Sequence, residues 1–152
     1  MNEAFKVWET SRKVYVKILE SYSLEQLNFI PEGLSNNIIW NIGHIAFVQQ
    51  ALVYKLSGLP MMVSDELYDK YKNGSQPNAN TSSEEVAIIK QLLVDAIEKT
   101  KNDYANGLFT TYNEFTTTTG FNLASVEDAI NFNNFHEGTH LGFILKIKKF
   151  VL

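Results

Sequence analysis

The chain contains no cysteine among its 152 residues. Disulfide bonds, thiolate nucleophiles and cysteine metal ligands are therefore excluded, and the composition is compatible with a reducing compartment. Long apolar runs are also absent, since no stretch approaches the roughly 18 residues that a membrane span needs. Residues 1–10 carry Glu3, Lys6 and Glu9 and so lack the apolar core of a signal peptide. We expect a soluble, cytoplasmic protein with no membrane partner.

Positive charge is scarce as well. The chain has 13 Lys and Arg against 17 Asp and Glu, a formal net charge of -4. Binding to a phosphate backbone favours a basic face, so we expect no nucleic-acid partner. The hydrophobic content of 45% is enough for a core. The length fits one domain spanning residues 1–152, because a chain of this size buries roughly 68–70% of its unfolded surface.

Four segments combine apolar residues at helical spacing with capping residues near their starts. They cover about residues 2–20, 35–57, 82–106 and 125–150. A capping box at Ser23–Gln26 predicts a further short helix that ends before Pro31. The β-branched stretch at residues 110–119 disfavours helix, so one hairpin or an extended loop is expected there. The pattern predicts an all-α protein, a four-helix bundle with one long crossover loop.

Histidine is rare, but its three copies have an informative spacing. His136 and His140 lie four residues apart, which places them on one face of the fourth helix. The same face carries apolar residues, so both rings should point inward, where a buried imidazole needs a partner. Those apolar residues are Ala129, Phe132, Ile144, Ile147 and Val151. Two such rings can chelate one ion.

His44 supplies the third candidate ligand, from a partly apolar face of the second long helix. Three histidines without cysteine are typical of catalytic metal sites that keep an open position. Imidazole suits Zn, Ni, Fe or Cu, so residue type alone does not choose the metal. Asn41, Asn133 and Glu137 lie three residues before a histidine and could orient its ring. The alternative for each is a helix-surface position or ordinary hydrogen bonding.

Residues 136–140 read H-E-G-T-H and so match the zinc-metalloprotease motif, in which Glu is the general base. In the usual protease families the third ligand follows that helix, whereas residues 141–152 contain no His, Asp or Glu. We therefore expect the third ligand upstream, at His44, and no peptidase activity. Glu137 should lie about 100° around the helix from His136, which disfavours it as a base beside the ion.

The connection from Met61 to Thr81 is long for a small domain. Ser64–Tyr68 could form one helical turn within it. Connections of this length are often functional, so we predict that this one borders the metal site, with Tyr68 or Tyr71 lining a pocket. A plain crossover link is the alternative.

Three passages carry a resemblance to the DinB/YfiT-like superfamily of bacterial metal-binding four-helix bundles. Ser35–Ile45 resembles the second helix of that family, with its metal histidine. Gly74–Pro77 resembles the turn in its crossover, and His136–Gly142 resembles its final H-x-x-x-H helix. Element order and length agree over essentially the whole chain.

The resemblance implies that His44, His136 and His140 bind a divalent ion, commonly zinc or nickel, beside a solvent-open cavity. Some relatives are S-transferases or isomerases that use low-molecular-weight thiols such as bacillithiol, mycothiol or glutathione, and others are called metal-dependent hydrolases. A metal-dependent enzyme with a small-molecule substrate is thus the leading interpretation, with no catalytic residue assigned. The alternative is a non-catalytic module that binds a metal or small ligand. A homodimer is compatible with both.

Overall fold

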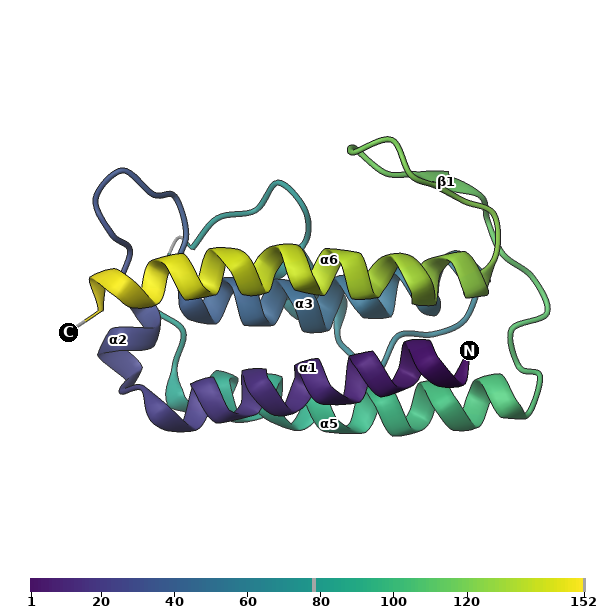
Figure 1. Ribbon diagram of the computed structural model, residues 1–152, viewed down its shortest axis with the longest axis horizontal. Helices are drawn as coiled ribbons and strands as arrows, with labels where there is room; N and C mark the ends of the chain where they lie inside the picture. The colour runs from purple at the N-terminus through teal and green to yellow at the C-terminus, as the bar shows by residue number, and fades with distance from the viewer. Residues whose placement is uncertain (78, 152) are drawn as a thin grey trace.

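The protein is almost entirely helical in the computed structural model, which describes residues 1–77 and 79–151. Four long helices lie side by side (Figure 1), with α6 over α3 in one layer and α1 beside α5 in the other. Their bounds are α1 Asn2–Ser21, α3 Ile38–Val53, α5 Ser83–Ala105 and α6 Val126–Ile147. The shorter helices are α2 Leu24–Asn28, η1 Lys55–Ser57, α4 Asp65–Tyr71 and η2 Lys148–Phe150. The all-α prediction is confirmed.

Local capping sets most helix starts, as the sequence predicts. Five capping side chains each accept a hydrogen bond from the backbone N–H three residues further along the chain. They belong to Ser23, Asn37, Ser64, Ser82 and Ser125. This satisfies one of the backbone donors that a helix leaves free at its first turn. The capping box at Ser23 forms in full. At the other end of the second long helix, the chain tightens into η1 and stops at Gly58, whose φ of 71° suits glycine.

Helix α3 is the most deeply buried element. Fourteen of its 16 residues are buried, because it contacts α2, α4, α5 and α6. Polar side chains on this helix must therefore find partners inside the protein. Helix α1 has a single buried stripe instead, which contains five apolar residues at helical spacing. These are Phe5, Trp8, Tyr15, Ile18 and Leu19.

Two connections differ in detail from the sequence prediction. Helix α4 runs to Tyr71, beyond the single turn expected at residues 64–68, and it packs against α3. A two-stranded antiparallel hairpin joins β1 (Phe115–Thr116) to β2 (Asn122–Leu123), so pairing extends past the threonine-rich stretch. Within residues 1–77 and 79–151, none of the helices is both long and apolar enough to cross a membrane.

Candidate metal centre

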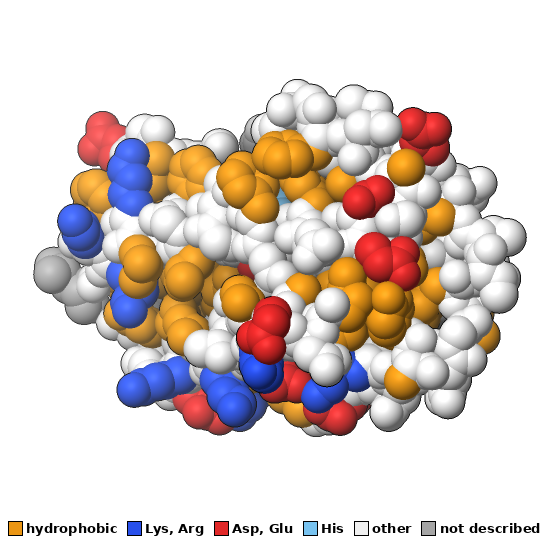
Figure 2. All heavy atoms as spheres, turned by 45° about the vertical axis from the view of Figure 1, so that its right-hand side comes forward, with side chains coloured by type: hydrophobic (Ala, Val, Ile, Leu, Met, Phe, Trp, Pro, Cys, Tyr) orange, Lys and Arg blue, Asp and Glu red, His pale blue; other side chains and the backbone are white. Residues whose placement is uncertain are grey.

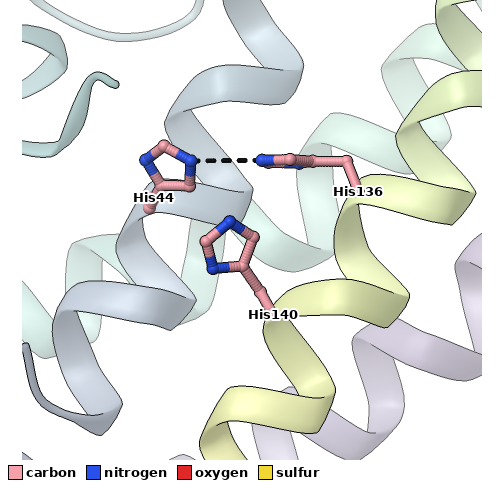
Figure 3. Close-up of side chains that lie close together, drawn as sticks. All are labelled: His44, His136 and His140. Atoms are coloured by element: carbon pink, nitrogen blue, oxygen red, sulfur yellow. Dashed lines mark hydrogen bonds between the residues drawn. The ribbon is translucent and has the colours of Figure 1, made fainter. Parts of the chain in front are cut away.

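The three histidines meet at the contact between α3 and α6. His44 extends from α3 toward His136 and His140, which lie one turn apart on α6 (Figure 3). One ring nitrogen from each of the three lies within 4.8 Å of the other two. His44 is buried, with 4% of its surface exposed, whereas His136 and His140 are half-buried. The structure therefore brings together all three residues that the sequence singles out.

The spacing of two of these nitrogens suits a metal ion. Nε2 of His44 lies 3.1 Å from Nε2 of His136. Two nitrogens that each bind a tetrahedral zinc ion at 2.0–2.1 Å are separated by about 3.3 Å. The observed separation is close to that value, so these two rings need little movement to share an ion.

The other nitrogen of His44 is fixed by the backbone of α4. Nδ1 lies 2.7 Å from the carbonyl oxygen of Tyr71, which can only accept, so Nδ1 donates its proton there. Nε2 then carries the free lone pair, as a ligand requires. The indole of Trp40 stacks on the ring, with centroids 4.9 Å apart, and donates from Nε1 to Ser75 Oγ. As predicted, the 61–81 connection borders the site.

His140 is oriented in the same way by an amide oxygen. Its Nδ1 lies 2.8 Å from Oδ1 of Asn41. The Asn41 amide has a defined direction, because its Nδ2 donates to the Asn37 carbonyl at 2.7 Å and to Asn36 Oδ1 at 3.1 Å. Oδ1 therefore accepts from Nδ1 of His140, whose Nε2 keeps its lone pair. The sequence spacing pairs Asn41 with His44, whereas the structure pairs it with His140 across the helix interface.

The surroundings of all three rings favour their neutral form. Burial lowers the pKa of His44 below its usual 6.5, although the Tyr71 carbonyl opposes this. Burial, with the neighbouring histidines and Arg12 as further causes, lowers the pKa of His136 to about 2. Burial and His44 lower the pKa of His140 to about 3. Neutral imidazole is the form that binds a metal, so the ligands do not compete with protons at pH 7.

Glu137 faces away from the histidines. Its carboxylate accepts from Arg12 at 2.7 and 3.1 Å and from Asn133 Nδ2 at 2.6 Å, and the hydroxyl of Tyr15 donates to its backbone carbonyl. Glu137 and Asn133 do not lie on the helix surface, since both are buried, and ordinary hydrogen bonding, the other alternative, is what the structure shows for them. Glu137 cannot act as the general base of a protease here, because its carboxylate is paired with Arg12 of α1.

Arg12 was missed by the sequence analysis, although a signal for it exists. It falls four residues after Trp8 and three before Tyr15, inside the apolar stripe of the first helix. A charged residue at such a position needs a buried partner of opposite charge. On α6, Asn133 and Glu137 belong to the buried face that meets α1 near Arg12. His136 and His140 lie beside that face, on the side of α6 that meets α3.

Gly43 lets the 61–81 connection approach His44. A Cβ added there would lie 2.5 Å from two ring carbons of Tyr71. The Tyr71 ring cannot easily yield, because it stacks on Phe47 with centroids 5.0 Å apart. Its hydroxyl is also hydrogen-bonded, to Glu85 and Thr81. We expect Gly43→Ala to lower the free energy of unfolding by about 1–3 kcal/mol, measured by urea denaturation.

Gly138 provides the matched control for that variant. It lies within α6, and a Cβ there would meet nothing within 4 Å. Gly138→Ala should raise the free energy of unfolding by about 0.5–1 kcal/mol through helix propensity. Equal stability of the two alanine variants would contradict the close packing of Tyr71 on Gly43.

Apolar rings surround the half-buried side of the site. Phe132 lies 6.2 Å from the ring of His136, and Phe143 lies 6.3 Å from that of His140. Phe121 and Phe135 extend this group and are 43% and 52% exposed. In Figure 2 a small part of a histidine is visible between hydrophobic side chains. Two hollows on the surface, one beside Phe29 and one beside Leu67, contain none of the histidines.

The fold and the site together define an all-α protein with a three-histidine cluster able to hold a metal ion. The family model of the DinB superfamily matches residues 8–144. The chain therefore belongs to the DinB superfamily. Comparison with curated proteins gives no significant match.

Proposed function

We propose that the protein binds a divalent metal ion through Nε2 of His44, His136 and His140. The observation that carries this proposal is the orientation of the rings. Two Nδ1 atoms donate to fixed oxygens, Tyr71 O and Asn41 Oδ1, which leaves the Nε2 lone pairs for an ion. The Nε2 atoms of His44 and His136 are hydrogen-bonded at 3.1 Å (Figure 3), and a shared cation would take the place of the proton between them. Zinc, nickel and iron all suit this donor set.

We further propose that the protein is a metal-dependent enzyme acting on a small molecule. A bound ion would supply Lewis acidity and lower the pKa of a water or a thiol. Hydrolysis also calls for a general base, and Glu137 is already engaged by Arg12 and Asn133. A thiol starts from a pKa of about 8.5, far below that of water, so the same ion would leave it ionised at pH 7 without a base. This favours transfer of a low-molecular-weight thiol over hydrolysis.

The apolar rings beside the histidines support a substrate with an apolar or aromatic part. Phe143 contacts the ring of His140, and Phe121 and Phe135 contact Phe132, which lies against His136. Phe121, Phe135 and Phe143 are each about half exposed. Aromatic side chains at such a position bind a partner by stacking and by burial of apolar area. A non-catalytic module that binds metal or a small ligand is the second candidate, because exposed aromatic rings next to a metal would bind a ligand equally well without any reaction.

The remaining parts of the proposal come from the sequence and the family. We propose that the four long helices form one DinB-like four-helix bundle spanning residues 1–152. A cytoplasmic location, the absence of a nucleic-acid partner and the possibility of a homodimer belong to the same proposal.

Turnover of an aromatic electrophile separates the candidate functions. Zinc-loaded protein mixed with chlorodinitrobenzene and a low-molecular-weight thiol should form the aryl thioether: a C–S bond forms, the C–Cl bond breaks, chloride leaves and the thiol proton goes to solvent. We expect the protein to accelerate this reaction over the uncatalysed rate only when thiol and metal are both present. Phenol formation without thiol would instead indicate a hydrolase. Zinc binding without turnover of either kind would indicate a binding module.

A further inference from the structure

A group of buried polar atoms behind His136 has no partner among the described residues. Nη1 of Arg12, Oδ1 of Asn133 and Nδ1 of His136 each lack a hydrogen bond, whereas the Glu137 carboxylate has the indole of Trp8 beside it. Each such atom costs about 1–3 kcal/mol if it stays unsatisfied. Nη1 of Arg12 is a donor, Nδ1 of His136 can be one, and Oδ1 of Asn133 is an acceptor. Buried groups of this kind are commonly bridged by ordered water.

The direction of the Asn133 amide follows from the ion pair below it. Arg12 donates to Glu137 Oε1 at 2.7 Å in a buried contact. Nδ2 of Asn133 donates to the same oxygen at 2.6 Å. An amide oxygen in that position would face the carboxylate instead, so the reversed orientation is excluded. Oδ1 of Asn133 is therefore the end left free, and it can only accept.

His136 requires an acceptor on the same side. When its Nε2 serves as a metal ligand, the proton of the neutral ring must sit on Nδ1. That N–H is buried and lacks a partner among residues 1–77 and 79–151. Asn133 precedes His136 by three residues, which places the two side chains next to each other on α6. The residue with the free acceptor and the residue with the free donor are therefore neighbours on one helix.

We propose that Asn133 is the positioning residue for His136, accepting from Nδ1 through one buried water. This inference rests on the proposed metal binding. Each ring would then have its own oxygen partner: a backbone carbonyl for His44, the Asn41 amide for His140 and the Asn133 amide for His136. Arg12 and Glu137 act one step further back, because they hold the Asn133 amide in the orientation that presents Oδ1.

Replacing Asn133 by leucine removes the proposed acceptor for His136 and keeps all three histidine ligands. We expect zinc affinity to fall about 10- to 100-fold, measured by competition with a chelator. Nitrogen-15 NMR of the zinc-loaded wild type should show His136 with its proton on Nδ1 and slow exchange with solvent. In Asn133→Leu the exchange of that proton should be faster. Asn133→Ser, which keeps a small acceptor, should recover part of the affinity and remains available should the leucine variant fold poorly.

Asn134 is the matched control. It is the next residue on α6 and donates to the Ala4 carbonyl at 3.1 Å, away from the histidines. Asn134→Leu should keep zinc affinity within about threefold of wild type, because this side chain contacts α1 and not the histidines. Unchanged zinc affinity in both Asn133 variants, or a proton on Nε2 of zinc-loaded His136, would overturn the inference alone. A wild type that binds no zinc would refute the proposed function itself, and the inference with it.

Discussion

Replacement of His44 by alanine should lower zinc affinity by roughly 10²- to 10³-fold. Structural zinc sites with four ligands contribute about 10–16 kcal/mol, so one ligand accounts for about 3–4 kcal/mol. The variant leaves the His136–His140 helix intact and so isolates the contribution of α3. Isothermal titration or chelator competition gives the affinity directly.

Thermal unfolding separates ligand loss from fold loss in this experiment. At a free zinc concentration of about 100 Kd, the wild type should gain about 2.7 kcal/mol, or roughly 5–10 °C in Tm. His44→Ala should show little gain at that concentration. Its metal-free Tm reports separately the cost of leaving the Tyr71 carbonyl without its donor. A variant with wild-type zinc affinity would show that His44 is not a ligand.

Removing only one member of the Arg12–Glu137 pair should destabilise the protein by about 3–5 kcal/mol. The side chains of both residues are at most 3% exposed. Arg12→Met leaves a buried carboxylate without its cation, and Glu137→Met leaves the guanidinium without its anion. The double variant removes both charges, so its free energy of unfolding should lie much closer to wild type. Urea denaturation of the four proteins completes the double-mutant cycle.

A surface ion pair provides the control for that cycle. Lys90 on α5 and Glu20 on α1 are 2.5 Å apart, with side chains 42% and 55% exposed. Lys90→Met should change the free energy of unfolding by less than about 1 kcal/mol, because water screens exposed charges. Additive effects of Arg12→Met and Glu137→Met would contradict the buried pairing.

The sequence by itself determined the helices and the candidate ligands. A helix cap such as Ser125 bonds to a backbone N–H only three residues away, so the local sequence is enough to predict it. The pairing of His136 with His140 follows from helix geometry in the same way. The third candidate, His44, came from the small number of histidines, the inward-facing position of each and the family resemblance.

Only the tertiary structure decided how those side chains are partnered. Arg12 meets Glu137 across 125 residues, Asn41 orients His140 on another helix, and the Tyr71 carbonyl orients His44. Each contact depends on the rotation and register of one helix against another. Packing of the whole core sets these quantities, because a helix turned by one residue presents a different side chain to its neighbour. Local spacing fixes which residues share a face, and the packed core fixes what that face meets.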